Sequence, residues 1–387
     1  MGFAIDEDGS RENEMTMSES GEYHKGVKYL CGNGIAKVPA MYILPVSERP
    51  DIDPRNINIA SNHSINLPII DFAQLQGTNR SQTIVSLAKA CQEYGFFQLI
   101  NHGIEVDCID GIRDVSKKFF GLPYEERSKY MSRDMHSPVR YGTSFNQNND
   151  KVFCWRDFLK LSCHPLSEVL PSWPSSPPEL RQAVANFSMN TKSLYLKLME
   201  AMLESLGLIE TTANGINNGK ESSSSSSSSS TMEFEDGSQL IVMNCYPSCP
   251  EPELTLGIPP HSDYGFLTLL LQDQQVQGLQ IQHQQEWVNV EPLPNSFIVN
   301  VGDHLEIFSN GRYKSVLHRV VVNSYKSRIS VASLHSLPFD AVVRPSPKLI
   351  DISNPRRYKD TDFSNFLHYI ASREHNTKNF LDSRKLT

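Results

Sequence analysis

Hydrophobic positions divide this chain into two halves with different periodicities. In the first half, apolar residues follow helical spacing over 81–94, 106–120, 123–130 and 177–206, and short apolar runs at 67–72, 96–100 and 158–161 predict strands. The polar, glycine-containing stretch 140–149 predicts a loop. After Gln239, short alternating or apolar runs are separated by Gly, Pro, Asn and Asp. We predict strands there at 240–246, 266–272, 279–282, 287–290, 297–301, 313–322 and 329–334.

This order of segments predicts an α+β fold. Many short strands with regular turns are typical of a sandwich or barrel, and we expect a double-stranded β-helix, or jelly roll, at 238–340. A largely helical region at 26–210 would pack on it, and 341–387 would form a C-terminal helical segment. The polar tail 1–25 and the insertion 211–237 cannot bury enough apolar area to offset their ordering entropy, so we predict disorder in both. The insertion contains nine consecutive serines, 222–230, and a neutral role is favoured over regulation by phosphorylation.

Composition narrows the class of protein. The 387 residues are 39% hydrophobic and 21% charged, as in ordinary soluble proteins. A net charge of −8 argues against binding to nucleic acid, which needs a basic face. The longest apolar run is far too short to cross a membrane, and the acidic N-terminus resembles no secretory signal. Seven cysteines without a CxxC pair indicate reduced thiols, so we expect a cytoplasmic protein, with the nucleus as the alternative compartment. We also expect a monomer.

Two histidines and one aspartate carry the first chemical signal. In a strand, residues two apart face the same side, so His261 and Asp263 can reach one point in space, and His318 can complete the set. Two imidazoles and one carboxylate hold Fe(II) while leaving coordination positions open. With twelve histidines in the chain, His-x-Asp alone is a weak signal. Asp303-His304 is a rival pair, but adjacent residues on a strand would face opposite sides.

The second signal is an anchor for a carboxylate. The Arg328 guanidinium is a rigid fork that matches a carboxylate, and Ser330, two residues on, shares its face. A redox metal beside a carboxylate anchor indicates an oxygenase that consumes an organic acid as co-substrate.

Further motifs turn these signals into a family resemblance that covers about 38–381, apart from the serine tract. Besides the three metal-type residues and the Arg-x-Ser pair, the chain carries segments similar to those of the plant Fe(II)/2-oxoglutarate-dependent dioxygenases. They are Gly95-Phe96-Phe97-Gln98, Asn101-His102-Gly103, Asn244-Cys245-Tyr246-Pro247-Ser248-Cys249-Pro250, Gly302-Asp303-His304-Leu305-Glu306 and Ser309-Asn310-Gly311.

The resemblance implies a role for seven residues. Fe(II) would be held by His261, Asp263 and His318, and 2-oxoglutarate by Arg328, Ser330, Tyr246 and Asn244. O2 would be the second co-substrate and ascorbate the reductant, and a hydroxylated product would form as 2-oxoglutarate becomes succinate and CO2. For Tyr246 a structural reading stays open, because buried tyrosines often pair their hydroxyl with backbone.

Within the family, two segments are similar to those of flavanone 3-hydroxylase-like and salicylate hydroxylase-like enzymes: Trp155-Arg156-Asp157-Phe158-Leu159 and Thr143-Ser144-Phe145-Asn146. Flavonoid-oxidising members carry phenylalanine six positions after the anchoring arginine, where this chain has Leu334. The lost stacking is of order ~1 kcal/mol and could be supplied by Phe145. We therefore expect Phe145, Leu334 and His335 to line the substrate side.

Three hypotheses follow for function. The leading one is hydroxylation of a small aromatic plant metabolite, with a flavanone as the first guess. The second is related chemistry on salicylate, an alkaloid, a hormone such as a gibberellin, or aminocyclopropane carboxylate, the last without 2-oxoglutarate. The third is a catalytically silent binding protein in which the metal is a structural clip.

Overall fold

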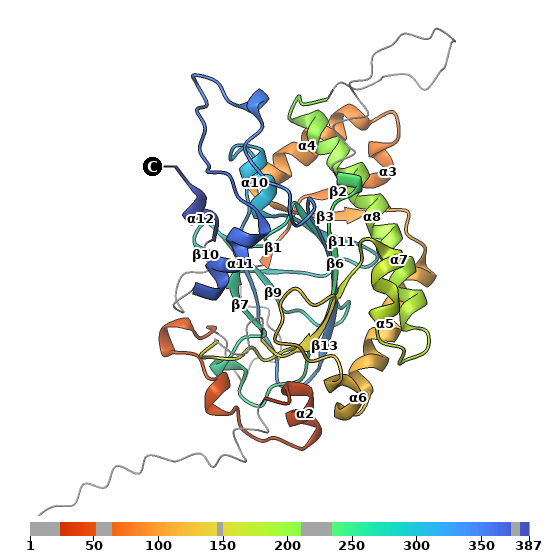
Figure 1. The fold of residues 1–387 in the computed structure, drawn as a ribbon. Coiled ribbons are helices and arrows are strands. Elements are labelled where there is room, and N and C mark those ends of the chain that lie inside the picture. Colours follow the sequence, from red (N-terminus) through yellow and green to blue (C-terminus); the bar gives the residue numbers. More distant parts are fainter. Residues whose placement is uncertain (1–23, 52–63, 145–149, 210–233, 373–379, 387) are drawn as a thin grey trace, which may run out of the picture.

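Two facing β-sheets form the core of the protein (Figure 1). The computed structural model describes residues 24–51, 64–144, 150–209, 234–372 and 380–386. The larger sheet has eight strands, in the order β2 (Ile69–Asp71), β3 (Phe96–Ile100), β11 (Phe297–Val301), β8 (Leu267–Leu271), β13 (Arg328–His335), β6 (Gln239–Tyr246), β5 (Asp157–Ser162) and β4 (Val139–Gly142). The smaller sheet has five, in the order β1 (Ser64–Ile65), β10 (Glu286–Val290), β9 (Leu279–His283), β12 (His318–Val320) and β7 (Ile258–His261).

Helices cover the outer face of the larger sheet. The long α8 (Leu180–Ser205) lies against α4 (Arg80–Glu93) and α5 (Val106–Gly121), and it contacts β6, β8 and β13 (Figure 1).

The other helices are α2 (Val27–Gly32), α3 (Phe72–Leu75), α6 (Tyr124–Ser128), α7 (Leu166–Val169), α10 (Asp303–Phe308), α11 (Phe363–Ser372) and α12 (Phe380–Arg384). Short 3-10 turns occur at Ala40–Tyr42, Val46–Glu48, Leu170–Ser172, Pro252–Leu254 and Pro347–Leu349. None of the helices in the described ranges is both long and apolar enough to cross a bilayer.

Strand β13 shows how the sheet presents two chemically different faces. On the outer face, Ser333 hydrogen-bonds Thr191 of α8, and His335 stacks on Tyr195 of the same helix. Because successive side chains of a strand alternate, the intervening residues face the smaller sheet. Those inner-face residues are Arg328, Ser330, Ala332 and Leu334.

The expected α+β jelly roll is confirmed, and most predicted elements agree with the structure. The predicted helix at 106–120 corresponds to α5, and the predicted strand at 297–301 to β11. The larger sheet also takes strands from both sides of the serine-rich insertion, since β2 to β5 precede it.

Four local predictions were wrong. The 140–149 loop begins as strand β4, and the 313–322 strand shortens to β12. Strand β7 was missing from the predicted strands. It contains Pro259 and Pro260 and lies at a sheet edge, where proline is tolerated. Asp303 and His304 open helix α10 rather than lying on a strand.

The segment before residue 51 closes one end of the core. The buried carboxylate of Asp157 accepts hydrogen bonds from the Val27 and Lys28 amides at 2.8 and 3.1 Å, and from Tyr141 Oη and Thr143 Oγ1. The predicted disorder of 1–25 and of the serine tract falls almost entirely on residues outside those described.

Candidate active site

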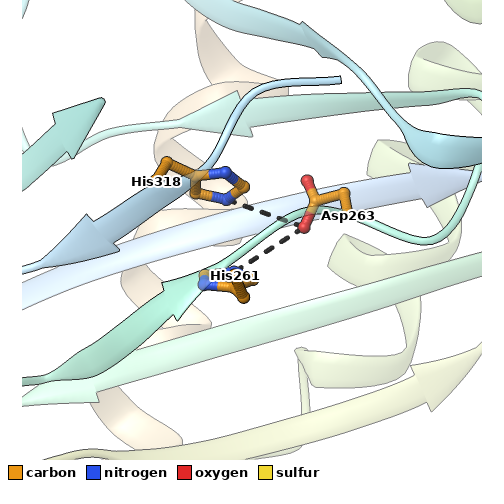
Figure 2. A group of neighbouring side chains, drawn as sticks. All are labelled: His261, Asp263 and His318. Atoms are coloured by element: carbon orange, nitrogen blue, oxygen red, sulfur yellow. Dashed lines mark ion pairs between the residues drawn. The ribbon is translucent and has the colours of Figure 1, made fainter. Parts of the chain in front are cut away.

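The two histidines and the aspartate converge on one point between the sheets (Figure 2). His261 and His318 are direct cross-strand partners on β7 and β12, and their ring centroids lie 4.1 Å apart. Asp263 lies two residues beyond β7, and its Oδ1 is 3.7 Å from Nε2 of each histidine. One ligand atom from each residue therefore lies within 4.8 Å of the other two.

Hydrogen bonds orient both imidazoles toward this point. His261 Nδ1 lies 2.9 Å from the Pro259 carbonyl oxygen, and His318 Nδ1 lies 3.2 Å from that of Val316. A carbonyl oxygen only accepts, so each Nδ1 carries the proton and donates it. Each Nε2 then keeps its lone pair directed at the shared point, as metal-binding imidazoles require.

Two further side chains hold the aspartate. Thr268 Oγ1 and Asn300 Nδ2 donate to Asp263 Oδ2 at 2.6 and 2.8 Å, which leaves Oδ1 for the histidines. Burial alone would raise the pKa of Asp263, but His318, His261 and these two donors together lower it below its usual value. The carboxylate is thus charged at neutral pH. Sequence reasoning missed Thr268 and Asn300; the only signal for them was their position on predicted strands 266–272 and 297–301.

A buried arginine lies in the same chamber. Arg328 is 2% exposed, and its Nη2 donates to Gln272 Oε1 at 3.2 Å. Its Nε and Nη1 have no hydrogen-bond partner among the described residues. Burial lowers the pKa of this guanidinium, and Tyr246 and Asp273 oppose that shift. A buried cation with two free donors is costly unless a ligand completes it, and a carboxylate matches that fork.

Strand register places the other predicted co-substrate residues beside Arg328. On β6, Tyr246 pairs with Arg328 and Asn244 with Ser330. The Arg328 guanidinium carbon lies 5.2 Å from the Tyr246 ring centroid. Asn244 Oδ1 accepts from Arg156 Nη1 at 3.2 Å.

Two glycines make room for this group. A Cβ on Gly257 would lie 2.6 Å from Tyr246 Cδ1, and a Cβ on Gly278 would lie 3.1 Å from Arg328 Cδ. Both distances are shorter than ordinary contacts of a Cβ atom, so only glycine lets the backbone come this close to Tyr246 and Arg328.

The three residues expected on the substrate side have different outcomes. Leu334 lies on the inner face of β13 and pairs with Thr268, the residue that holds Asp263. His335 does not face the site. It points to the helices, 4.3 Å from the Tyr195 ring, and burial there lowers its pKa to about 3. The expectation was wrong because a one-residue step along a strand reverses the side-chain direction. Phe145 lies outside the described residues.

The donor set fits iron and a dicarboxylate. Two neutral imidazoles and one carboxylate are the ligands that non-haem Fe(II) oxygenases use, and they leave positions open for other ligands. The free donors of Arg328 suit the distant carboxylate of 2-oxoglutarate.

Comparisons with known proteins agree with this geometry. Residues 237–336 match the 2OG-Fe(II) oxygenase superfamily, and residues 67–180 match the family described as non-haem dioxygenase in morphine synthesis, N-terminal. The chain is 40% identical to DMR6-LIKE OXYGENASE 1 of Arabidopsis thaliana over 81% of this chain and 83% of that protein. It is 37% identical to Flavanone 3-dioxygenase 2 of Oryza sativa subsp. japonica over 87% of this chain and 91% of that protein.

Among solved structures, the crystal structure of JOX2 in complex with 2OG, Fe and JA is similar, with a TM-score of 0.78 and 30% identity. The alignment covers 94% of this chain and 98% of that one. Fold, site geometry and relatives thus lead to one conclusion: this chain belongs to the 2OG-Fe(II) oxygenase superfamily and is a dioxygenase that uses iron and 2-oxoglutarate.

Proposed function

We propose that this dioxygenase binds Fe(II) through His261, Asp263 and His318 and hydroxylates a small aromatic plant metabolite. The observation that carries the assignment is the pairing of two features in one chamber. The three ligand atoms lie within 4.8 Å of one another, and the buried Arg328 keeps two donors unpaired on the same inner face. A silent binding protein would need neither a carboxylate anchor nor a triad with open positions.

Each residue has a distinct task. Arg328 would hold the distal carboxylate of 2-oxoglutarate with its unpaired donors, and Ser330 would add a hydroxyl from the same face. The ring of Tyr246 lies against the guanidinium, and Asn244 lies two residues from Tyr246 on the same face of β6. Iron held by the triad supplies, with 2-oxoglutarate and O2, the oxidation that inserts one oxygen atom as succinate and CO2 form.

Thr268 and Asn300 act through Asp263 rather than on the substrate. By donating to Oδ2 they fix the carboxylate plane, so that Oδ1 stays directed at the metal position. The proton on each histidine Nδ1 is held by a backbone carbonyl, which keeps Nε2 available throughout turnover.

The relatives support an aromatic or related plant metabolite, since one of them is named a flavanone 3-dioxygenase. The test is incubation of purified protein with Fe(II), 2-oxoglutarate, ascorbate and a panel of flavanones and simple phenolics. Succinate release coupled to a product heavier by one oxygen is the expected result. Succinate without any oxygenated phenolic would overturn the aromatic assignment, and no succinate with any substrate would overturn the catalytic one. A monomeric, cytoplasmic protein remains a prediction.

A further inference from the structure

Three basic side chains gather on the inner face of the larger sheet, at its β4–β5 edge. Arg140 lies on β4, Lys160 on β5, and Arg156 immediately before β5. We propose that these residues, here called the basic group, bind the carboxylate of the substrate, so that the substrate is a small organic acid. This inference rests on the proposed function and narrows its substrate class.

Strand pairing brings the three side chains to the same face. Lys160 pairs with Arg140 on one side and with Val242 of β6 on the other. Arg156 and Lys160 lie two residues on either side of Phe158, so all three share a face. The guanidinium carbons of Arg156 and Arg140 lie 5.0 and 5.4 Å from the Phe158 ring centroid. Both guanidinium groups of the basic group therefore lie against one phenyl ring.

No carboxylate of the described residues lies within ion-pair distance of this group, although Asp134 and Asp150 lie near enough to act on it electrostatically. Arg140 and Arg156 are 5% and 8% exposed, and none of the ion pairs among the described residues includes Arg140, Arg156 or Lys160. Their partners are neutral oxygens: Arg140 Nε donates to Ser132 O, Lys160 Nζ to Met135 O, and Arg156 Nη1 to Asn244 Oδ1. Arg156 Nε has no partner within the described part of the chain.

The electrostatics show what this arrangement costs. Burial, followed by the charge of Arg140, lowers the pKa of Lys160 to about 8. Burial, followed by the charge of Arg156, lowers the pKa of Arg140. Arg140 and Arg156 are buried and Lys160 is half-buried, and Asp134 and Asp150 oppose these pKa shifts. Because no carboxylate of the described residues pairs directly with the three cations, an anion that binds among them would stabilise the group. A neutral flavanone offers no such charge, whereas an aromatic acid does.

The basic group lies at a useful distance from the metal position. Along the sheet, β5 is three strands from β8, which carries Thr268, and three spacings of about 4.8 Å amount to roughly 14 Å. Asp263, which accepts a hydrogen bond from Thr268, lies at the far end of this span. A small acid bound by the basic group would extend toward the iron site while Arg328 binds 2-oxoglutarate separately.

The inference is tested by equilibrium binding to the full-length protein, loaded with Fe(II) and 2-oxoglutarate in the absence of O2. The probes are benzoate, salicylate and cinnamate, each paired with its uncharged amide. Calorimetry should show at least one acid binding about tenfold or more tightly than its amide, as expected for charge-assisted hydrogen bonds. If no acid is preferred over its amide, the inference is wrong.

Variants identify the residues responsible. Arg156→Met and Lys160→Met should each weaken binding of the preferred acid by about 10- to 100-fold, while the amide changes less than about threefold. Lys118→Met, which removes an exposed cation on α5, should change neither. If Arg156→Met instead weakens 2-oxoglutarate and spares the acid, Arg156 acts through Asn244 on the co-substrate and the inference is overturned. Succinate release is measured separately, so that failure of the proposed function shows as its absence whatever the binding preference.

Discussion

Replacing Arg328 by methionine tests the anchor most directly. The change removes the charge and both unpaired donors while keeping an unbranched chain that fills most of the volume. Hydrogen bonds to charged groups contribute about 1.5–3 kcal/mol each, so two lost bonds amount to about 3–6 kcal/mol. Because such terms are not additive, we expect the lower end, and about 1.4 kcal/mol per tenfold gives a Kd for 2-oxoglutarate raised roughly 100- to 1000-fold.

The ligand-free protein should respond in the opposite way. Arg328 is a buried cation with Nε and Nη1 unpaired, and exchanging such a group for an apolar one is often neutral or stabilising. We therefore expect the free energy of unfolding without 2-oxoglutarate to fall by less than about 1 kcal/mol, or to rise. The combination of lost binding and retained stability distinguishes a ligand anchor from a structural ion.

The assay is calorimetric titration of 2-oxoglutarate into Fe(II)-loaded protein without O2, alongside urea unfolding of the free protein. Arg319→Met is the matched control, because Arg319 is also buried but hydrogen-bonds Gln280 and lies 4.4 Å over the Trp287 ring. The Arg319→Met variant should bind 2-oxoglutarate with an affinity close to that of the wild type. If both variants bind equally, or if Arg328→Met binds like the wild type, the reasoning about the anchor fails.

Three further predictions concern other parts of the structure. Thr268→Val removes a hydrogen bond to Asp263 Oδ2 and should weaken Fe(II) binding about 10- to 100-fold in a metal titration. Thr255→Val is the control, because the buried Thr255 hydroxyl has no partner among the described residues, and it should leave Fe(II) binding unchanged. The Asp157 carboxylate accepts from two backbone amides and two hydroxyls and pairs with Arg127, so Asp157→Asn should lower the free energy of unfolding by about 2–4 kcal/mol. Denaturation curves that match the wild type would contradict this. The pKa of Lys160 is lowered from 10.5 to about 8 in the folded protein. Between these pH values the unfolded chain binds more protons than the folded one, so the free energy of unfolding of the wild type should rise by up to about 3 kcal/mol as the pH rises from about 8 to 10.5. Lys160→Met should lack that gain, and parallel pH–stability curves for the two proteins would refute the shift.

The metal-type residues could be predicted from sequence because their chemistry is local. His261 and Asp263 lie two positions apart, and the combination with Arg328 and Ser330 is specific enough to predict one chamber. The strand argument for them was nevertheless incomplete, since Asp263 lies beyond the end of β7. Hydrogen bonds from Thr268 and Asn300 hold the Asp263 carboxylate beside the histidines instead.

Helix α10 shows a signal that was present but was interpreted as a strand. Gly302 precedes Asp303, and Asp303 and Glu306 both lie in the first turn, where acidic side chains favour the helix N-terminus. Burial then raises the pKa of Asp303 to about 7, while Ser315 and Ser262 donate to it. The pair Asp303-His304 therefore supports the Asp263 loop and does not compete for metal.

The basic group could not be predicted in this way, because only strand register assembles it. Arg140, Arg156 and Lys160 come from a stretch predicted to be partly loop, and no sequence spacing relates them to Asn244 or Thr268. If β5 paired with β6 one residue further along, Lys160 would point to the helices and Leu159 to the site. The outer-face position of His335 follows from the same rule. Sequence motifs therefore predict which chemistry the site performs, while the register of β4, β5, β6 and β13 determines which charges its substrate meets.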